Sequence, residues 1–271
     1  MADPEKQKQD AEERSAPSGA VVYKAIRSEG EDELERSTSA LAWSGLAAGL
    51  SMGFSFLAQG VLHSHLPNAG WRPLLSSFGY SIGFLIVILG RQQLFTENTL
   101  TVILPLLARR DRKTMHNVAR LWVTVFLANL VGAMAFAFAL ARTRLFSDNV
   151  GFALLRVAEA SFLADFWTTV LRGVFAGWLI ATMVWLLPFA ESARVWVIII
   201  ITYVVGLAGF SHVIAGSVEA MYLAAGGHIS WYDCFGLYVM PALIGNVIGG
   251  VSLVAAINHA QVVAGGDGKD L

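Results

Sequence analysis

Two polar residues, Thr96 and His212, each fall within a long apolar stretch and are the first candidates for chemistry. Thr96 lies in the polar insert Gly90–Asn98, where it would open a helix. The free N–H groups and the positive dipole end at a helix start stabilise an anion or a carboxylic acid. His212 is the only histidine deep in an apolar stretch, and an ionisable group at membrane depth marks a functional site. The structural alternatives are a helix cap for Thr96 and a satisfied core residue for His212.

Four charged residues also lie within or beside apolar stretches: Arg91, Glu97, Arg172 and Glu219. An unpaired charge at that depth is costly, so we expect these residues to be paired. Glu219 follows His212 by seven residues, which is two helical turns along the same face. We expect Glu219 to pair with Arg91 or Arg172, and lining a transport path is its alternative role.

Tyr80 and Phe84 lie one helical turn apart before the first insert and could form an apolar constriction, with simple packing as the alternative. The sequence shows no nucleophile–base pair, no metal-ligand set and no phosphate-binding loop. We therefore expect no enzymatic activity, no cofactor and no metal site. A formal net charge of −1 gives no indication of nucleic-acid binding, and the single cysteine, Cys234, forms no disulfide framework.

These residues must be positioned by helices that cross a membrane. Hydrophobic residues make up 55% of the chain and charged residues only 14%, well below the charge of a soluble domain. Uncharged apolar runs of about 20 residues match the thickness of a bilayer core. The chain is thus predicted to be an all-α membrane protein with six spans: Leu41–Leu62, Leu74–Leu89 with Thr99–Ala108, Val118–Ala141, Phe166–Leu187, Val195–Ala208 with Val213–Ala225, and Cys234–Ile257.

The predicted division is a polar cytoplasmic tail at 1–38, a membrane domain at 39–259 and a second cytoplasmic tail at 260–271. A short surface helix is expected within Ala20–Arg36 and another near Leu154–Leu163. Twelve Lys and Arg residues fall on the side that holds both termini, against four on the other side. Positive residues mark the cytoplasmic side, so both termini are predicted to be cytoplasmic.

The six spans divide into two sets of three, and the interrupted span is the second member of each set. Thr96 precedes Asn129 by 33 residues, and His212 precedes Asn246 by 34. The first members also match, with Gly49 and Gly177 each following an alanine. Because an odd number of spans reverses orientation, the pattern predicts an inverted repeat with Thr96 and His212 as symmetric partners. Paired breaks of this kind indicate a binding site near the middle of the membrane.

Four motifs, in this order, resemble those of the formate–nitrite transporter family: Leu94-Phe95-Thr96-Glu97-Asn98, Arg172-Gly173 with Met183-Val184-Trp185, Gly209-Phe210-Ser211-His212, and Gly245-Asn246-Val247-Ile248-Gly249-Gly250. The resemblance covers about Ala40 to His259. It implies an aquaporin-like fold with interrupted second and fifth helices, and a homopentamer with one pore per subunit. It also implies passage of formate, nitrite or hydrosulfide.

By the same resemblance, Thr96 and His212 are the central pore residues, supported by the polar residues Glu97, Asn98, Ser211, Asn129 and Asn246. Tyr80 and Phe84 fall at the outer constriction and Val205 at the inner one, with Leu94 and Phe95 also at a constriction.

The chain departs from the family pattern at two positions. Ser161 replaces a vestibule lysine that would attract anions, and Gly177 replaces an asparagine near the central histidine. The chain most resembles a poorly characterised bacterial inner-membrane branch of the family that lacks that lysine.

The predicted function is a multi-pass channel of the bacterial inner membrane for small monovalent weak-acid anions, passed with a proton as the neutral acid. Its expected partners are the weak acid, protons, the lipid bilayer and further copies of the chain. Two alternatives stay open: a channel for a small neutral solute, and a membrane scaffold or sensor that does not transport.

Overall fold

The computed structural model describes residues 17–264 and is all-helical in that range. Five helical segments are apolar and long enough to cross a membrane: Thr38–His65, Arg72–Leu89, Arg112–Arg142, Phe166–Phe189 and Trp231–Gln261. Two shorter apolar helices, Asn98–Arg109 and Val213–Gly226, follow the two breaks. The predicted all-α class is confirmed, and the halves of the interrupted spans are separate helices.

The helices of the first half are α2 (Gly19–Glu35), α3 (Thr38–His65), α4 (Arg72–Ser76), η1 (Ser77–Tyr80), α5 (Ser81–Leu89), α6 (Asn98–Thr101), α7 (Ile103–Arg109) and α8 (Arg112–Arg142). They are followed by α9 (Asp148–Phe162), α10 (Phe166–Leu186), η2 (Leu187–Phe189), η3 (Glu191–Ala193), α11 (Arg194–Leu207) and α12 (Val213–Gly226). The last segment is one continuous helical stretch formed by α13 (Trp231–Asp233), η4 (Cys234–Val239), α14 (Met240–Val247), η5 (Ile248–Ala255) and α15 (Ala256–Ala264).

Short polar side chains start the long helices where the apolar runs begin. Asp111 accepts a hydrogen bond from the Thr114 amide at the start of α8, and Asp165 accepts from the Trp167 and Thr168 amides at the start of α10. Hydrogen bonds from the hydroxyls of Thr114 and Thr168 lower the pKa of the two carboxyls, which are therefore ionised at the positive helix ends. Asp111 places the start of α8 six residues before the predicted span, because polar turns extend the helix beyond the membrane.

Both halves use the same close packing between their first and third long helices. A Cβ at Gly49 of α3 would lie 2.1 Å from the Asn129 carbonyl oxygen of α8. A Cβ at Gly177 of α10 would lie 2.3 Å from the Asn246 carbonyl oxygen of α14. Small residues allow this backbone contact in a membrane, where no hydrophobic effect holds helices together. Gly177 is therefore a packing residue that matches Gly49 in the repeat.

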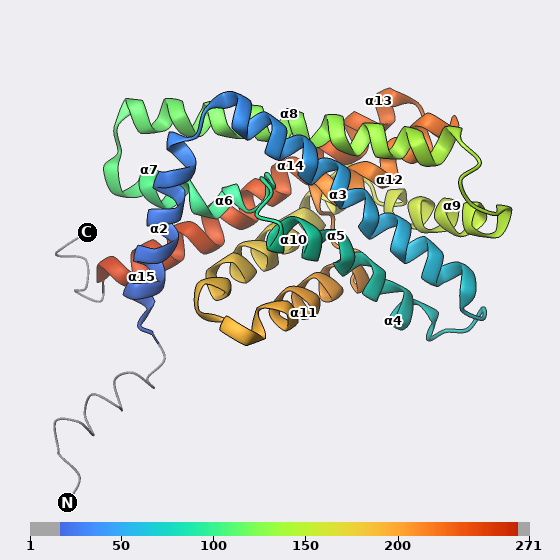
Figure 1. The fold of residues 1–271 in the computed structure, drawn as a ribbon, viewed down its shortest axis with the longest axis horizontal. Coiled ribbons are helices and arrows are strands. Elements are labelled where there is room, and N and C mark those ends of the chain that lie inside the picture. Colours follow the sequence, from blue (N-terminus) through green and yellow to red (C-terminus); the bar gives the residue numbers. More distant parts are fainter. Residues whose placement is uncertain (1–16, 265–271) are drawn as a thin grey trace, which may run out of the picture.

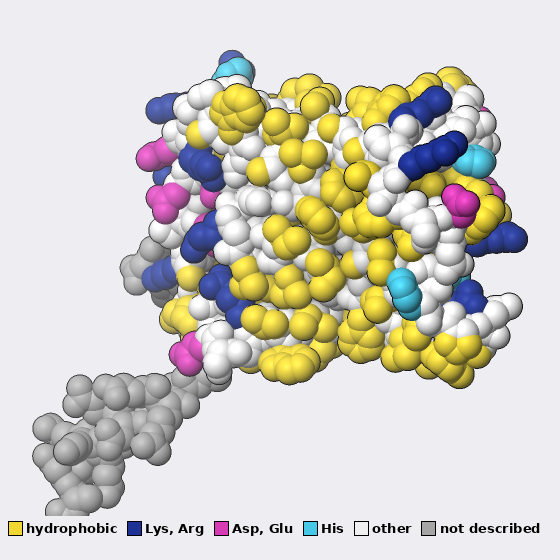
Figure 2. Space-filling view, turned by 45° about the vertical axis from the view of Figure 1, so that its right-hand side comes forward, with side chains coloured by type: hydrophobic (Ala, Val, Ile, Leu, Met, Phe, Trp, Pro, Cys, Tyr) yellow, Lys and Arg dark blue, Asp and Glu magenta, His cyan; other side chains and the backbone are white. Residues whose placement is uncertain are grey.

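Different helices form the two ends of the molecule, and the surface between the ends is apolar (Figure 1 and Figure 2). In Figure 1, α2, α7 and α15 lie at the end near both termini, whereas α4, α9 and α13 lie at the opposite end. Figure 2 shows apolar side chains across the middle of the visible face, with charged side chains gathered toward its two ends. A continuous apolar belt of this kind is the surface that lipid or further protein must cover.

Helix α2 is packed onto the membrane domain. Its Tyr23, Ile26 and Leu34 are buried, and a Cβ at Gly30 would lie 2.0 Å from the Thr101 carbonyl oxygen. The division at residue 38 stays a prediction, but Gly19–Glu35 is helical and its inner face belongs to the core. The earlier part of the predicted tail, 1–16, and residues 265–271 lie outside the described residues. The helix expected near Leu154–Leu163 begins earlier, at Asp148, after the extended residue Ser147.

Candidate functional site

The two breaks have the same backbone geometry. Arg91 and Gly209 each adopt a left-handed conformation, with φ of 50° and 65°. In each break the next residue turns back onto the preceding helix, because the Gln92 amide donates to the Val87 carbonyl and the Phe210 amide to the Val205 carbonyl, at 2.9 and 3.0 Å. At the breaks, each residue of the first half therefore corresponds to the residue 118 positions later in the second half. Arg91 corresponds to Gly209, and Val87 corresponds to Val205.

Two buried asparagines satisfy the backbone groups that the breaks leave free. Asn129 accepts from the Phe95 amide and donates to the Gly45 and Gln93 carbonyls, at 2.9, 2.7 and 2.9 Å. Asn246 repeats the pattern with the Val213 amide and the Gly173 and Ser211 carbonyls, at 2.9, 2.9 and 2.7 Å. Unpaired backbone groups at this depth would cost several kcal/mol each, roughly, so the amides stabilise the broken conformation.

This register corrects one expectation from the sequence. The breaks are symmetric, as predicted, but Thr96 and His212 are not each other's equivalents. The asparagine contacts match Gln93 with Ser211 and Phe95 with Val213, so His212 corresponds to Leu94 and Thr96 to Ile214. The spacings of 33 and 34 residues were too coarse to distinguish neighbouring positions.

Thr96 and His212 instead meet at the centre of the molecule. The Thr96 Oγ1 and His212 Nε2 atoms are 2.7 Å apart, and both side chains are fully buried. The Nδ1 atom of His212 accepts a hydrogen bond from the Ala215 amide at 3.1 Å and so caps α12. A neutral imidazole that accepts at Nδ1 carries its proton at Nε2. Nε2–H therefore donates to Thr96, and the Thr96 hydroxyl proton is left to donate to a third group.

Aromatic rings lead from this pair to a small cavity on the α9 side. The Phe84 ring lies edge-on to the His212 ring at 4.9 Å, and the Tyr80 ring lies 5.4 Å from Phe84. Tyr80 and Val205 both line a cavity of about 30 Å³. The resemblance assigned them to opposite constrictions, whereas the structure places them together, because Gly206 packs directly against the Tyr80 ring.

Leu94 and Phe95, which directly precede Thr96, are buried. The Phe95 ring packs edge-on against Trp122 and Phe126 of α8, at 5.6 and 5.1 Å. This packing turns the Phe95 ring toward α8, and its role in a constriction stays a prediction.

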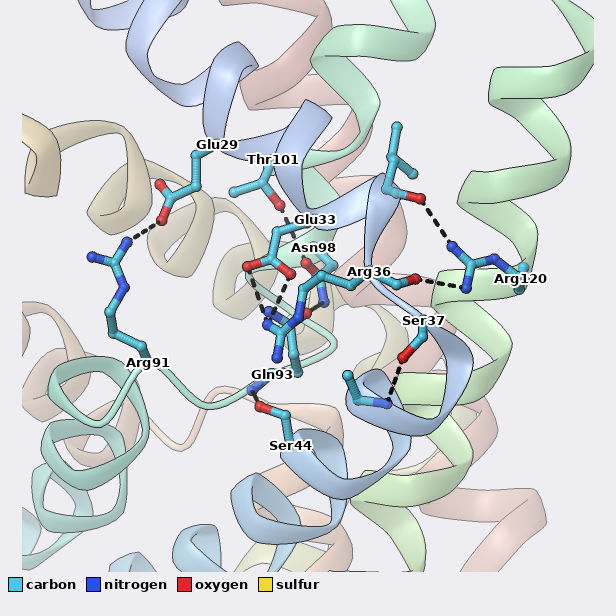
Figure 3. Close-up of polar contacts among 12 residues, drawn as sticks. Glu29, Glu33, Arg36, Ser37, Ser44, Arg91, Gln93, Asn98, Thr101 and Arg120 are labelled. Atoms are coloured by element: carbon cyan, nitrogen blue, oxygen red, sulfur yellow. Dashed lines mark hydrogen bonds and ion pairs between the residues drawn. The ribbon is translucent and has the colours of Figure 1, made fainter.

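A larger cavity, about 530 Å³ in volume, lies where α2 covers the first break. Figure 3 shows Arg91 reaching Glu29 of α2, while Ser44 holds the Gln93 amide. Within residues 17–264, three buried polar atoms that line this cavity have no hydrogen-bond partner: Gln92 Oε1, Glu97 Oε1 and Arg194 Nε. Among these residues, only Glu97 was identified from the sequence. Sequence reasoning missed Gln92, Arg194 and also Gln93, whose carbonyl accepts a hydrogen bond from Asn129. The polar insert was the only signal for Gln92 and Gln93, and Arg194 lies outside it.

The predicted pairing of the charged residues is corrected in part. Arg91 pairs with Glu29 at 3.0 Å and its side chain is 73% exposed, because the left-handed turn directs it outward. Glu219 is 4% exposed and lines the same small cavity as Ser161. In the part of the chain that the structure describes, neither Glu219 nor Arg172 forms an ion pair.

The helices form an inverted repeat, and its two breaks meet at one buried polar pair. This architecture is typical of a membrane transport protein. The formate/nitrite transporter family matches residues 20–260. The chain therefore belongs to the formate/nitrite transporter family.

Known relatives and solved structures agree with this assignment. The chain is 38% identical over 251 residues to inner membrane protein YfdC of Escherichia coli K12, covering 93% of this chain and 81% of that protein. It is 25% identical over 234 residues to formate channel BtFdhC of Bacillus thuringiensis, covering 83% and 88%. A pentameric formate channel with formate bound has a similar fold at 20% identity, with a TM-score of 0.68 over 88% of this chain and 99% of that chain. An FNT family ion channel gives a TM-score of 0.74 at 20% identity, over 89% and 98%.

Proposed function

We propose that the chain is a channel for small monovalent weak-acid anions, of the formate or nitrite type, and that it passes them with a proton as the neutral acid. The observation that carries the proposal is the buried Thr96–His212 pair, which is reached past the Tyr80 and Phe84 rings. Support also comes from relatives described as formate channels, which match along most of this chain.

The cost of charge favours the neutral acid. A bare charge at the centre of a bilayer costs from about 3 to more than 10 kcal/mol. Protonating an acid with a pKa of about 4 at pH 7 costs roughly 4 kcal/mol. Carrying the neutral acid is therefore competitive or cheaper wherever the path is as apolar as the Phe84 region, which is fully buried.

The hydrogen-bond pattern suggests distinct roles for the central pair. Thr96 would donate its hydroxyl proton to an oxygen of the passing acid, while His212 Nε2–H orients that hydroxyl. A second proton on His212 would have to displace the Ala215 amide from Nδ1. In this proposal His212 is thus a fixed donor that stabilises the acid, and Tyr80, Phe84, Leu94 and Val205 form the apolar path.

The proposed setting is the bacterial inner membrane, with both termini in the cytoplasm and five copies in the assembly. The structural relative described as a pentameric channel supports the copy number, and the relative described as an inner membrane protein supports the membrane. The cavity covered by α2 would then face the cytoplasm and the Tyr80 cavity the outside.

The test is a flux panel in proteoliposomes with formate, nitrite, hydrosulfide, acetate and glycerol at two pH values. We expect formate or nitrite flux that rises as pH falls, and its near loss in Thr96→Val and His212→Ala. His212→Asn is the matched variant, since asparagine is a good helix cap but has no Nε2–H for Thr96. Flux that survives in both His212 variants would contradict the proposed site.

One observation favours a second candidate, a channel for a small neutral solute. The described wall of the Tyr80 cavity contains no Lys or Arg that would attract an anion, and Ser161 is part of that wall. Vesicle swelling in glycerol or urea, in the absence of formate uptake, would favour this candidate over the first.

A further inference from the structure

A buried carboxyl, that of Glu219, lies beside the proposed path and is not used by the central pair. Glu219 is on α12, and seven residues of helix place it about 10 Å from His212 along the helix axis. Its side chain is 4% exposed and lines the same cavity as Tyr80 and Val205. An acid that reaches the Tyr80 ring through this cavity therefore passes beside the Glu219 carboxyl.

The surroundings of Glu219 hold it in the protonated form. The polar groups that face it from the packed elements are Gln59 of α3, Tyr80 of η1, Ser161 of α9, Ser211 of the second break and Tyr238 of η4. None of these carries a positive charge. Arg172 of α10 does not form an ion pair with Glu219 among the described residues. A buried carboxylate without a cation is strongly disfavoured relative to the neutral carboxylic acid.

The Glu219 carboxyl is shielded from bulk water, but it lines a cavity that can hold water. The cavity of about 30 Å³ is large enough for a water molecule. Ser161, which lines this cavity together with Glu219, is partly exposed on α9. A proton can therefore reach Glu219 from the α9 side through Ser161 and water, while the rings of Tyr80 and Phe84 separate it from the central pair.

We propose that Glu219 is the proton donor that converts an incoming weak-acid anion into its neutral acid before the apolar constriction. This inference rests on the proposed function. The O–H bond of the Glu219 carboxyl breaks, and a new O–H bond forms on an oxygen of the anion, so that formate becomes formic acid and Glu219 a carboxylate. The carboxylate then takes a proton from water on the α9 side. The neutral acid continues past Tyr80 to Thr96.

The test compares Glu219→Gln with wild type in proteoliposomes that hold a pH dye, with formate supplied at outer pH 7 and at outer pH 5. Glutamine keeps the size and hydrogen bonds of the side chain but has no proton to give. We expect formate-driven proton uptake at pH 7 to fall by about tenfold or more. At pH 5 the solution itself supplies about a hundredfold more formic acid, so the loss should largely disappear. Glu219→Asp should restore much of the flux at pH 7.

Glu159→Gln is the matched control, because Glu159 is a carboxyl of α9 that is 45% exposed and pairs with Arg156. It should behave like wild type. Equal losses at both pH values would indicate a structural role for Glu219, and increased flux in Glu219→Gln would indicate a carboxylate that repels anions. Either result overturns the inference while leaving the proposed function in place. A wild-type protein that moves none of formate, nitrite or hydrosulfide would instead remove the proposed function, and the inference with it.

Discussion

At the scale of single residues, Asn129 and Asn246 hold the two helix breaks together by hydrogen bonds to the backbone. The oxygen of each amide accepts from one backbone amide of its break, and the nitrogen donates to one carbonyl of the break and to one carbonyl of a neighbouring helix. An amide can do this without a charge, which would be costly to bury. The backbone groups at the two breaks are therefore satisfied without a buried charge.

Replacing either asparagine by alanine should be strongly destabilising. The change leaves one amide and one carbonyl of the break unpaired, at a cost of about 1 to 3 kcal/mol per group, and it removes a further bond to the Gly45 or Gly173 carbonyl of the neighbouring helix. Thermal unfolding in detergent should show a large decrease for Asn129→Ala and for Asn246→Ala. Asn149→Ala is the control, since Asn149 is exposed and bonds only to the Ser64 carbonyl. Comparable stability of all three variants would contradict the role given to the amides.

Gly177 should not tolerate the asparagine that the family resemblance expects there. The added Cβ would lie 2.3 Å from the Asn246 carbonyl oxygen and force α10 away from α14. We expect Gly177→Asn and Gly49→Ala to lose about 1 to 3 kcal/mol or more. Gly151→Ala on α9, where a Cβ meets nothing within 4 Å, should gain roughly 1 kcal/mol from helix propensity. The measurement is the unfolding midpoint of each variant in the same detergent.

At the scale of elements, α2 closes the cavity at the first break through packing and exposed ion pairs. The Arg91–Glu29 and Arg109–Glu31 pairs are largely exposed, and such pairs contribute about 1 kcal/mol or less. The buried Tyr23, Ile26 and Leu34 side chains contribute more. Helix α2 is thus held mainly by its apolar face.

Gly30→Leu should therefore displace α2, because its side chain would overlap the Thr101 carbonyl group. We expect faster proteolysis within Gly19–Glu35 and a lower unfolding midpoint. Gly19→Ala, at a position with open space around it, should neither speed proteolysis nor lower the midpoint. Removing residues 2–16 should also leave stability and flux unchanged, since the contacts of α2 named above lie within Gly19–Glu35. A transport defect in that deletion would favour a scaffold or sensor role for the tail.

The sequence predicted the elements better than it predicted their contacts. Six apolar runs and two polar inserts indicate the spans and breaks directly, because bilayer thickness sets the length of an apolar run. Helix ends such as Asp111 lie beyond the runs, since polar turns cost nothing outside lipid. The contact between Thr96 and His212 joins residues 116 positions apart, and no local pattern encodes it. The equivalence of Leu94 with His212 required the hydrogen bonds of the two asparagines.

At the scale of the whole molecule, the apolar belt in Figure 2 must be covered by lipid or by neighbouring subunits. Large apolar side chains such as Leu127 of α8 and Leu171 of α10 are 55% and 62% exposed in the single chain. We expect native mass spectrometry from mild detergent to give five times the mass of one chain. A species that stays monomeric across detergents while formate flux persists would contradict the pentamer without affecting the pore.

The asparagine bonds have a consequence for how this chain is assembled. Asn129 bonds only within the first half and Asn246 only within the second, whereas the Thr96–His212 bond joins the two. Two co-expressed fragments, cut between the exposed residues Leu145 and Phe146, should therefore each insert stably and regain flux on association. Each fragment alone should insert into the membrane but give no flux. Recovery of flux on co-expression would then measure the association of the two halves.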